Sequence, residues 1–419
     1  MGNSIKVLML VSNNLSHDAR VRKEAQTVAE AGFELTVIGV GAEIPADLKD
    51  APYQLILSSP QLLHLKNGKS LMPRWGRESV WYPLRVAVNL TVAPRRMRRW
   101  NTECTEDSPF TAAVGRPDME SLGVEQDPDI VHCHDLDTLW AGYRIAQRCG
   151  ARLVYDSHEI YLALPYLREE DREQYAQIEA QVFPHLDALI SVSPAIGQVL
   201  VRRYESDLTP VTLYNGGATV ASSVTTVSSP VKLFFQGLFA STRNNVELIY
   251  AMQQLRGKAT LTLQGWGSDE DELRDAIKEG ALEDVVTIIP PVAPLEVVES
   301  ANHYDVGIIN IIPTNENLVY ALPNKFFDYM CGGLAIASTS LLSIKEIIDK
   351  AGCGITYEPK GVEHTAQALD ELISDPQRIR RMKEASLASA PQYAWPAQTK
   401  KLVMLYEKLT LKINADVVD

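Results

Sequence analysis

The most informative chemistry in the sequence lies in one segment, Ala321-Leu-Pro-Asn-Lys-Phe-Phe-Asp-Tyr-Met-Cys-Gly-Gly333. It follows a buried-strand pattern and a polar loop, and Pro323 stands where a helix can begin. Asn324 and Lys325 then fall in the first turn, where free backbone N–H groups and the helix dipole favour an anion. Asp328 comes one turn later, placed to accept hydrogen bonds from ribose hydroxyls. The pattern predicts a bound diphosphate and ribose, and a surface ion pair of Lys325 with Asp328 is the other interpretation.

Two further strand-and-glycine turns point to the same ligand. In Phe234-Phe-Gln-Gly-Leu-Phe-Ala-Ser-Thr-Arg-Asn-Asn245, Gly237 ends a strand and lets backbone approach a ligand closely, while Arg243 can make a bidentate contact with phosphate. In Leu263-Gln-Gly-Trp-Gly267, Gly265 and Gly267 leave space for a flat base or ribose. Each turn is a weak signal alone, but together with Lys325 they predict a phosphate and nucleoside site.

Polar side chains also end two strands in the first half of the chain. His134 and Asp135 close the run Val131-His-Cys-His-Asp-Leu-Asp137, and His158 and Glu159 close Tyr155-Asp-Ser-His-Glu-Ile160. Imidazole and carboxylate groups there can orient sugar hydroxyls or manage a proton from an acceptor hydroxyl. The alternative is a metal site, which the absence of i, i+4 helical spacing disfavours. Its ligands would be His132, His134, Asp135, His158 and Glu159.

The loop after the first strand gives a third acceptor-side group. Asp18 is placed to cap the helix that begins Ala-Arg-Val-Arg-Lys, and Arg20 falls in the first turn, where it could meet an anionic acceptor. We place Asn14 and Arg20 on this acceptor side. The loop carries no G-x-G-x-x-G fingerprint, which disfavours a dinucleotide dehydrogenase, and the chain has no P-loop motif.

Two series of strands, each alternating with helical patterns, must position these residues. The rhythm predicts two doubly wound parallel sheets of the α/β class, with ligands bound at the carboxyl ends of the strands in a cleft between the domains. We expect domains at 1–215 and 231–394, a small polar linker at 216–230, and a C-terminal helix at 395–419 that closes the second domain or crosses back to the first. The expected strands are Lys6–Val11, Leu35–Val40, Tyr53–Leu57, Ile130–Cys133, Leu153–Tyr155, Ala188–Val192, Val211–Leu213, Lys232–Phe235, Thr260–Leu263, Val286–Ile289, Val306–Ile311, Ala335–Ala337 and Gly354–Tyr357.

Composition narrows the class further. A net charge of −13 over 419 residues argues against a nucleic-acid binder, and five cysteines without C-x-x-C spacing argue against a disulfide framework or zinc cluster. We expect a cytoplasmic protein without a signal peptide or transmembrane span. The segment Lys66–Arg99 nevertheless carries nine basic residues and one acid, with interspersed tryptophans. It suits an anionic membrane surface or a phosphate-bearing acceptor, and a solvated helix face is the equal alternative.

Taken together, the chain resembles the retaining enzymes of glycosyltransferase family four (glycosyl transferases group 1), which have the GT-B fold. The resemblance covers almost the whole sequence, including DARVRKEAQTVAEAGFELTVIG, PDIVHCHDLDTLWAG, SVSPAIGQVL, LQGWGSDEDEL and LPNKFFDYMCGG. It implies that Arg243 contacts the donor diphosphate, that Asp328 holds the ribose, and that His134 lies against the donor sugar. It also places the acceptor in the first domain.

The sequence departs from the family pattern at two places. The family usually has two acids eight positions apart, whereas here Tyr320 takes the first place and Asp328 the second. The usual Gly-Arg-Leu is Gly237-Leu238-Phe239, so one phosphate-binding cation is missing. We hypothesise that Lys325 supplies that charge.

The expected function is transfer of a sugar from a nucleotide diphosphate sugar to a glycan or glycolipid acceptor, with retention and without a metal. Arg243 and Lys325 would stabilise the departing diphosphate, and His134 would complete the catalytic set. A nucleotide-sugar 2-epimerase and a non-catalytic nucleotide-sugar-binding module are the alternatives. The basic segment 66–99 would hold the enzyme at the inner face of the plasma membrane.

Overall fold

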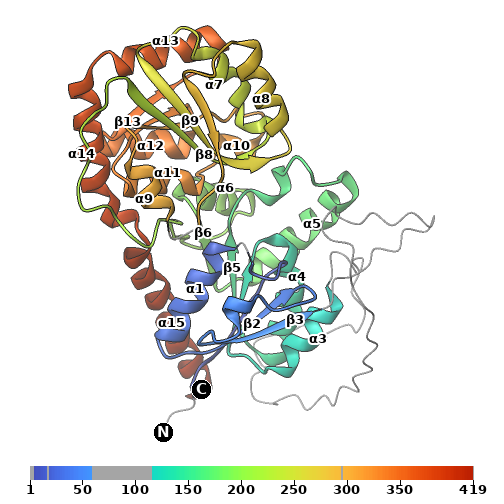
Figure 1. Cartoon of the computed structure of the whole chain (residues 1–419). Coiled ribbons are helices and arrows are strands. Elements are labelled where there is room, and N and C mark those ends of the chain that lie inside the picture. The colour runs from blue at the N-terminus through green and yellow to red at the C-terminus, as the bar shows by residue number, and fades with distance from the viewer. Residues whose placement is uncertain (1–3, 17, 59–115, 294–295, 419) are drawn as a thin grey trace. The chain divides into compact units, whose positions relative to one another are not determined.

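The computed structural model describes residues 4–16, 18–58, 116–293 and 296–418 (Figure 1). The basic segment Lys66–Arg99 lies outside these ranges. The chain divides into two compact units. The first comprises Met1–Ser191, Gly197–Thr212 and Lys401–Asp419, and the second comprises Val192–Ile196 and Leu213–Lys400.

The first unit is built on a parallel sheet of seven strands in the order β3-β2-β1-β4-β5-β6-β7. Its central strands β4 and β5 are buried along their whole length, as expected where helices cover both faces of a parallel sheet, although both also carry buried polar residues. The strands are β1 (Lys6–Leu10), β2 (Glu34–Val40), β3 (Gln54–Ser58), β4 (Ile130–His134), β5 (Arg152–Ser157), β6 (Ala188–Ser191) and β7 (Val211–Thr212).

The helices of this part of the chain connect consecutive parallel strands. Asp18 caps the first of them, as predicted, because its carboxylate accepts a hydrogen bond from the backbone N–H of Val21. The helices are α1 (Ala19–Glu30), α3 (Pro117–Glu125), α4 (Leu136–Cys149), α5 (Glu169–Val182) and α6 (Pro194–Arg203), with short 3-10 turns η1 (Ala46–Leu48), η3 (Tyr161–Ala163) and η4 (Phe183–His185).

The second unit has a parallel sheet of six strands in the order β10-β9-β8-β11-β12-β13. Residues 216–230, which precede it, form no helix or strand. The strands are β8 (Val231–Phe239), β9 (Ala259–Gly267), β10 (Val286–Ile289), β11 (Val306–Ile309), β12 (Ala335–Thr339) and β13 (Gly354–Tyr357).

Helices cover both faces of the second sheet (Figure 1). One apolar core joins the sheet to α7, α8 and α13, and the other joins it to α9, α11 and α12. The helices are η5 (Ser241–Arg243), α7 (Asn245–Ala251), α8 (Glu270–Glu279), α9 (Val297–Asn302), α10 (Glu316–Val319), α11 (Asn324–Cys331), α12 (Leu342–Ala351), α13 (Val362–Ile373), α14 (Pro376–Tyr393) and α15 (Trp395–Val418).

The predicted α/β class and both doubly wound sheets are confirmed. Each sheet begins with the strand order 3-2-1-4-5-6 of a dinucleotide-type fold, counted from its own first strand. The last helix, α15, contributes its residues from Lys401 onward to the first unit. None of the helices in the described ranges is long and apolar enough to cross a membrane.

Two segments that we predicted as loops belong to strands in the structure. β8 continues through Gly237 to Phe239, and β9 continues through Gly265 to Gly267. The two extensions pair with each other, Gly237 with Gly265 and Phe239 with Gly267. The missing side chains permit this pairing: a Cβ on Gly265 would lie 1.9 Å from the carbonyl oxygen of Gly237, and one on Gly267 would lie 2.0 Å from that of Phe239. These two glycines therefore serve close strand contact.

Candidate functional site

The start of α11 gathers the predicted phosphate-binding residues of the second unit. Pro323 is the residue before the helix, and Asn324 and Lys325 form its first turn, as predicted. Asn324 accepts a hydrogen bond through Oδ1 from Nδ2 of Asn215 at 2.8 Å. The backbone N–H of Phe326 in this first turn donates to the carbonyl oxygen of Pro323 at 2.9 Å.

Lys325 is buried rather than on the surface. Its side chain is only 9% exposed, and its ammonium group lies 3.7 Å from the centroid of the Phe235 ring. Burial, together with the charge of Arg243, holds the pKa of Lys325 well below its usual value. Lys325 is therefore not a surface residue, because it is enclosed between a helix start and a strand, although the charge of Asp328 acts on it.

Gly237 makes room for that ammonium group. Its φ is +127°, a conformation that glycine adopts freely, and a Cβ there would lie 3.1 Å from Nζ of Lys325. We expected Gly237 to admit a ligand. Instead, the group beside Gly237 is the ammonium group of Lys325, which the expected ligand would contact.

Asp328 is partly buried on the next turn of the same helix. Its Oδ2 accepts a hydrogen bond from Nε2 of Gln236 at 3.4 Å, and the backbone N–H of Gln236 donates to the hydroxyl of Tyr329 at 2.9 Å. Oε1 of Gln236 is buried without a hydrogen-bond partner among the described residues. Gln236 was not predicted as a site residue, and it lies within β8 beside Asp328.

The loop that carries Arg243 is held by the sheet. Arg243 ends the short turn η5, and Asn244 follows it in the left-handed conformation with φ +49°. Nδ2 of Asn310 donates to the carbonyl oxygen of Asn244 at 2.8 Å, and the Tyr357 hydroxyl donates to Oδ1 of Asn310 at 3.1 Å. The charge of Arg243 acts on Lys325, so the two predicted phosphate-binding cations are electrostatic neighbours.

The position of the missing family acid is occupied by the C-terminal end of α10. Tyr320 is partly buried there, and its backbone oxygen accepts a hydrogen bond from the Ser343 hydroxyl at 2.8 Å. A phenol takes the place of the carboxylate, so this position supplies no negative charge.

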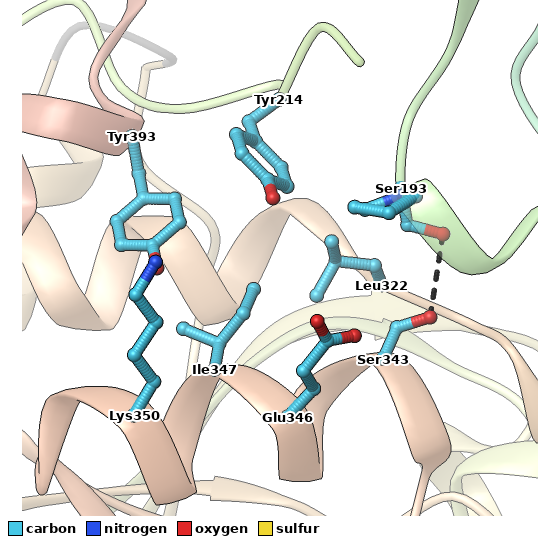
Figure 2. A pocket seen from close by; sticks show the side chains of 9 residues that line it. Ser193, Tyr214, Leu322, Ser343, Glu346, Ile347, Lys350 and Tyr393 are labelled. Atoms are coloured by element: carbon cyan, nitrogen blue, oxygen red, sulfur yellow. Dashed lines mark hydrogen bonds between the residues drawn. The ribbon is translucent and has the colours of Figure 1, made fainter. Parts of the chain in front are cut away.

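Two cavities of the second unit are too small for a nucleotide sugar, which needs several hundred Å³. One of about 40 Å³ lies among Ser193, Tyr214, Glu346 and Lys350, beside the 3.3 Å hydrogen bond between the Ser193 and Ser343 hydroxyls (Figure 2). It has room for very few water molecules. The other, of about 130 Å³, adjoins Asn245 and the beginning of α8.

In the first unit, His134 is buried at the carboxyl end of β4. It pairs in register with Asp156 of β5, whose Oδ2 lies 3.6 Å from Nδ1 of His134. Nδ1 of His134 is also 3.3 Å from Nε2 of His158. Burial, together with His132, lowers the pKa of His134 to about 3, so the ring is neutral at physiological pH.

The other predicted acceptor-side residues lie at the ends of β1, β4 and β5. Asp135 precedes α4 with φ +60° and accepts a hydrogen bond from the backbone N–H of His158 at 2.9 Å. Asn14 is partly buried and accepts a hydrogen bond from the backbone N–H of Ser16 at 3.2 Å. Glu159 is partly buried, and its carbonyl oxygen accepts a hydrogen bond from the Ser157 hydroxyl.

Arg20 does not face an acceptor as predicted. Its guanidinium is buried and lies 2.8 Å from Oδ2 and 2.9 Å from Oδ1 of Asp156, with Oε1 of Glu24 3.0 Å away. Although burial would raise the pKa of Asp156, Arg20 and the neighbouring imidazoles hold it well below its usual value. Burial raises the pKa of Glu24 to about 8 against the opposing effect of Arg20. Arg20 therefore pairs with Asp156 at the carboxyl end of β5 instead of facing an acceptor.

Sequence reasoning missed this buried network. Asp156 and Glu24 are its carboxylates, and Tyr406 of α15 closes it, with its hydroxyl 2.6 Å from Nδ1 of His132. The i, i+4 spacing of Arg20 and Glu24 was a detectable signal. The contact of Tyr406 with His132 joins residues 274 positions apart, and no local sequence signal indicates it.

The network also contains a set of metal-type ligands. One ligand atom from each of Glu24, His132, His134 and Asp156 lies within 4.8 Å of the others. The Arg20 guanidinium, however, already contacts both carboxylate oxygens of Asp156, at 2.9 Å and 2.8 Å. We therefore interpret the set as a buried ion-pair network in which Arg20 provides the positive charge.

Comparisons with known proteins agree with this architecture. Residues 20–218 match the model of Glycosyltransferase Family 4, and residues 230–375 match that of Glycosyl transferases group 1. The chain is a GT-B glycosyltransferase of the family 4, group 1 type. The two matches correspond to the two sheets described above.

Curated relatives share the family at low identity. The D-inositol 3-phosphate glycosyltransferase of Kineococcus radiotolerans is 26% identical over 334 residues, covering 71% of this chain and 75% of the relative. The enzyme of the same name from Thermobispora bispora is 22% identical over 318 residues, covering 69% and 72%.

Solved structures share the fold of this glycosyltransferase. The Anabaena protein HepE in complex with UDP has a TM-score of 0.69 and 13% identity, with 96% of this chain and all of that chain covered. Sucrose-phosphate synthase from Thermosynechococcus elongatus has a TM-score of 0.68 and 14% identity, with 97% and 100% covered.

Proposed function

We propose that this glycosyltransferase moves a sugar from a nucleotide diphosphate sugar to an acceptor hydroxyl with retention of configuration and without a metal ion, in the assembly of a cell-surface glycan or glycolipid. The observation that carries the proposal is the start of α11, where Lys325 is buried beside Gly237 and within the electrostatic reach of Arg243. Two cations near a helix N-terminus suit a diphosphate.

The reaction breaks the bond between the anomeric carbon and the diphosphate oxygen and forms a bond from that carbon to the acceptor oxygen. Negative charge develops on the departing diphosphate, and Lys325, Arg243 and the N–H groups of the first turn stabilise it there. The acceptor proton passes to the leaving phosphate on the same face of the sugar. We assign no protein nucleophile to this step.

Asp328 and Gln236 are the proposed ribose contacts. Their side chains are hydrogen-bonded to each other, and Oε1 of Gln236 has no hydrogen-bond partner among the described residues, which leaves an acceptor for a hydroxyl. Asn324 completes the proposed donor side, and Gly265 and Gly267 would contribute to it only by letting β9 pair closely with β8. On the acceptor side we propose His134, Asp135, His158, Glu159 and Asn14, with Arg20 acting through Asp156 rather than by touching an acceptor.

The first experiment is a thermal-shift screen with UDP, GDP, ADP and their sugars. HepE was solved with UDP and with UDP-glucose, which makes uridine diphosphate sugars the first donors to try. Product formed from the donor and a glycoside acceptor should keep the anomeric configuration of the donor by proton NMR. An inverted product contradicts retention, and isotope exchange at the second carbon of the sugar without acceptor would show an epimerase instead.

We further propose a cytoplasmic location at the inner face of the plasma membrane, through the basic segment 66–99. The support is the charge of that segment, +8 within a chain of net charge −13. Vesicles with anionic lipid should retain the protein at low salt, and replacing Arg95, Arg96, Arg98 and Arg99 by Gln should abolish retention. Equal retention of both proteins would contradict the proposal.

A further inference from the structure

Both ring nitrogens of His158 face a carboxylate. Nδ1 lies 3.2 Å from Oδ2 of Asp135, and Nε2 lies 3.5 Å from Oδ2 of Asp156. Such a ring interacts favourably with both neighbours only when each nitrogen carries a proton, which makes it an imidazolium. Burial opposes this charge, but Asp135 and Asp156 outweigh it and raise the pKa of His158 well above its usual value.

His134 lies next to the Nε2 side of the His158 ring. Its Nδ1 is 3.3 Å from Nε2 of His158, a distance that fits a hydrogen bond between one N–H and one lone pair. Oδ2 of Asp156 is further away, 3.5 and 3.6 Å from the two rings, and already accepts from Arg20 at 2.8 Å. Because Nε2 of His158 carries the proton, Nδ1 of His134 supplies the lone pair.

The proton of a neutral His134 must then be on Nε2. That nitrogen is buried and has no hydrogen-bond partner within the described ranges. A buried N–H without a partner is costly, so an oxygen atom of a bound molecule is its natural acceptor.

We propose that charged His158 is a positioning residue that locks His134 in its Nε2–H tautomer, so that His134 offers one fixed hydrogen-bond donor to a substrate oxygen. The identity of that oxygen, on the donor sugar or on the acceptor, rests on the proposed function. The lone pair of His134 faces His158 and not the substrate. His134 therefore donates a hydrogen bond and is not the base that deprotonates the acceptor.

Titratable and charged groups from several elements face these two rings and set the protonation pattern. Glu24 comes from α1 and Asp156 from β5. Among the described residues, the charged and titratable groups close to the two rings are Asp18, Glu24, His132, Asp135 and Asp156, with Arg20 bound to Asp156 and Tyr406 bound to His132.

Nitrogen-15 NMR of the full-length protein tests the tautomer without any substrate. The signals of His134 are assigned by their loss in His134→Gln. We expect a protonated Nε2 and a bare Nδ1 that stay unchanged from about pH 5 to 8, since the His134 pKa lies near 3. A proton on Nδ1, or titration of His134 in this range, would overturn the proposal.

Two variants separate positioning from a structural role. His158→Leu removes the donor to Nδ1, so His134 should populate both tautomers and transfer with the donor found by the screen should fall at least tenfold. His158→Gln keeps an amide N–H that reaches Nδ1, so the Nε2–H tautomer and most of the activity should return. Equal losses in the two variants, at equal thermal midpoints, would contradict the proposal.

The outcomes also distinguish this proposal from the proposed function. If the wild-type protein binds no nucleotide sugar but the His134 spectrum is as expected, the transferase assignment fails and the tautomer assignment stands. If transfer is observed and the spectrum shows a protonated Nδ1, the positioning role of His158 fails alone.

Discussion

The ammonium group of Lys325, in the first turn of α11, lies 3.7 Å from the centroid of the Phe235 ring of β8. A cation over an aromatic face is favourable, yet burial and the neighbouring Arg243 still lower the pKa of Lys325 well below its usual value. The charged form of Lys325 is therefore disfavoured where its side chain lies. On the proposed function, a dianionic diphosphate would favour that charged form again.

Nucleotide binding should therefore take up a proton. A diphosphate beside Lys325 raises its lowered pKa back toward the ordinary value, so the complex binds more protons than the free protein between the two pKa values. In that window the affinity for UDP or another nucleoside diphosphate should fall as pH rises. Calorimetry in two buffers of different ionisation enthalpy should give a positive proton uptake, and zero uptake from pH 6 to 10 would contradict it.

We expect Asp328 to hydrogen-bond to the 2′-hydroxyl of the ribose. Asp328→Asn should weaken a ribonucleoside diphosphate about tenfold, the usual effect of losing a charge-assisted hydrogen bond, and leave its 2′-deoxy analogue nearly unchanged. Asp349→Asn, on the exposed side of α12, is the matched control. Equal weakening of both nucleotides would show that Asp328 acts on something other than the 2′-hydroxyl.

We expect Gly237 to affect nucleotide binding through the position of the Lys325 ammonium group. Gly237→Ala places a methyl group 3.1 Å from Nζ at a φ of +127°, so it should displace the ammonium group and reduce nucleotide affinity. Gly257→Ala is the control, because Gly257 also has positive φ, +79°, but has nothing within 4 Å of its Cβ position. Both variants should lose roughly 1–2 kcal/mol of stability to backbone strain, but only Gly237→Ala should lose affinity. Identical affinities would contradict this account of the glycine.

The buried pair of Arg20 and Asp156 should dominate the stability of the first unit. Arg20→Met leaves Asp156 and Glu24 buried without their counter-ion and should cost roughly 3–5 kcal/mol of unfolding free energy in urea. Arg168→Met breaks an exposed pair with Asp171 and should cost ~1 kcal/mol or less. If the two variants lose similar stability, the buried pair of Arg20 and Asp156 does not dominate the stability of the first unit.

Local sequence patterns were enough to predict most of the fold. The runs Val286–Ile289 and Gly354–Tyr357 match the edge strands β10 and β13 at both ends, because their β-branched and aromatic residues favour a strand even where it is only partly buried. The start of α11 was equally readable, since Pro323 and the polar Asn324 mark a helix beginning. Both signals lie within a few residues of the feature they predict.

The errors came from long-range packing. Gly265 looks like a loop glycine in sequence, but its neighbour across the sheet, Gly237, turns it into strand. Arg20 looks exposed at a helix start, but Asp156, which is 136 positions away, draws it into the interior. Interactions between distant segments have no local sequence signature, so the surroundings of His134 could not be predicted from the motif alone.

The most direct test of the donor site is calorimetric titration of the wild-type protein and Lys325→Ala with the nucleoside diphosphate selected by the thermal-shift screen, using Lys345→Ala on α12 as the control. We proposed that Lys325 supplies the charge that the family otherwise draws from an arginine after the glycine of β8. We expect at least a tenfold loss of affinity for Lys325→Ala and no change for the control. Unchanged affinity in Lys325→Ala would contradict the assignment of this helix start as the diphosphate site.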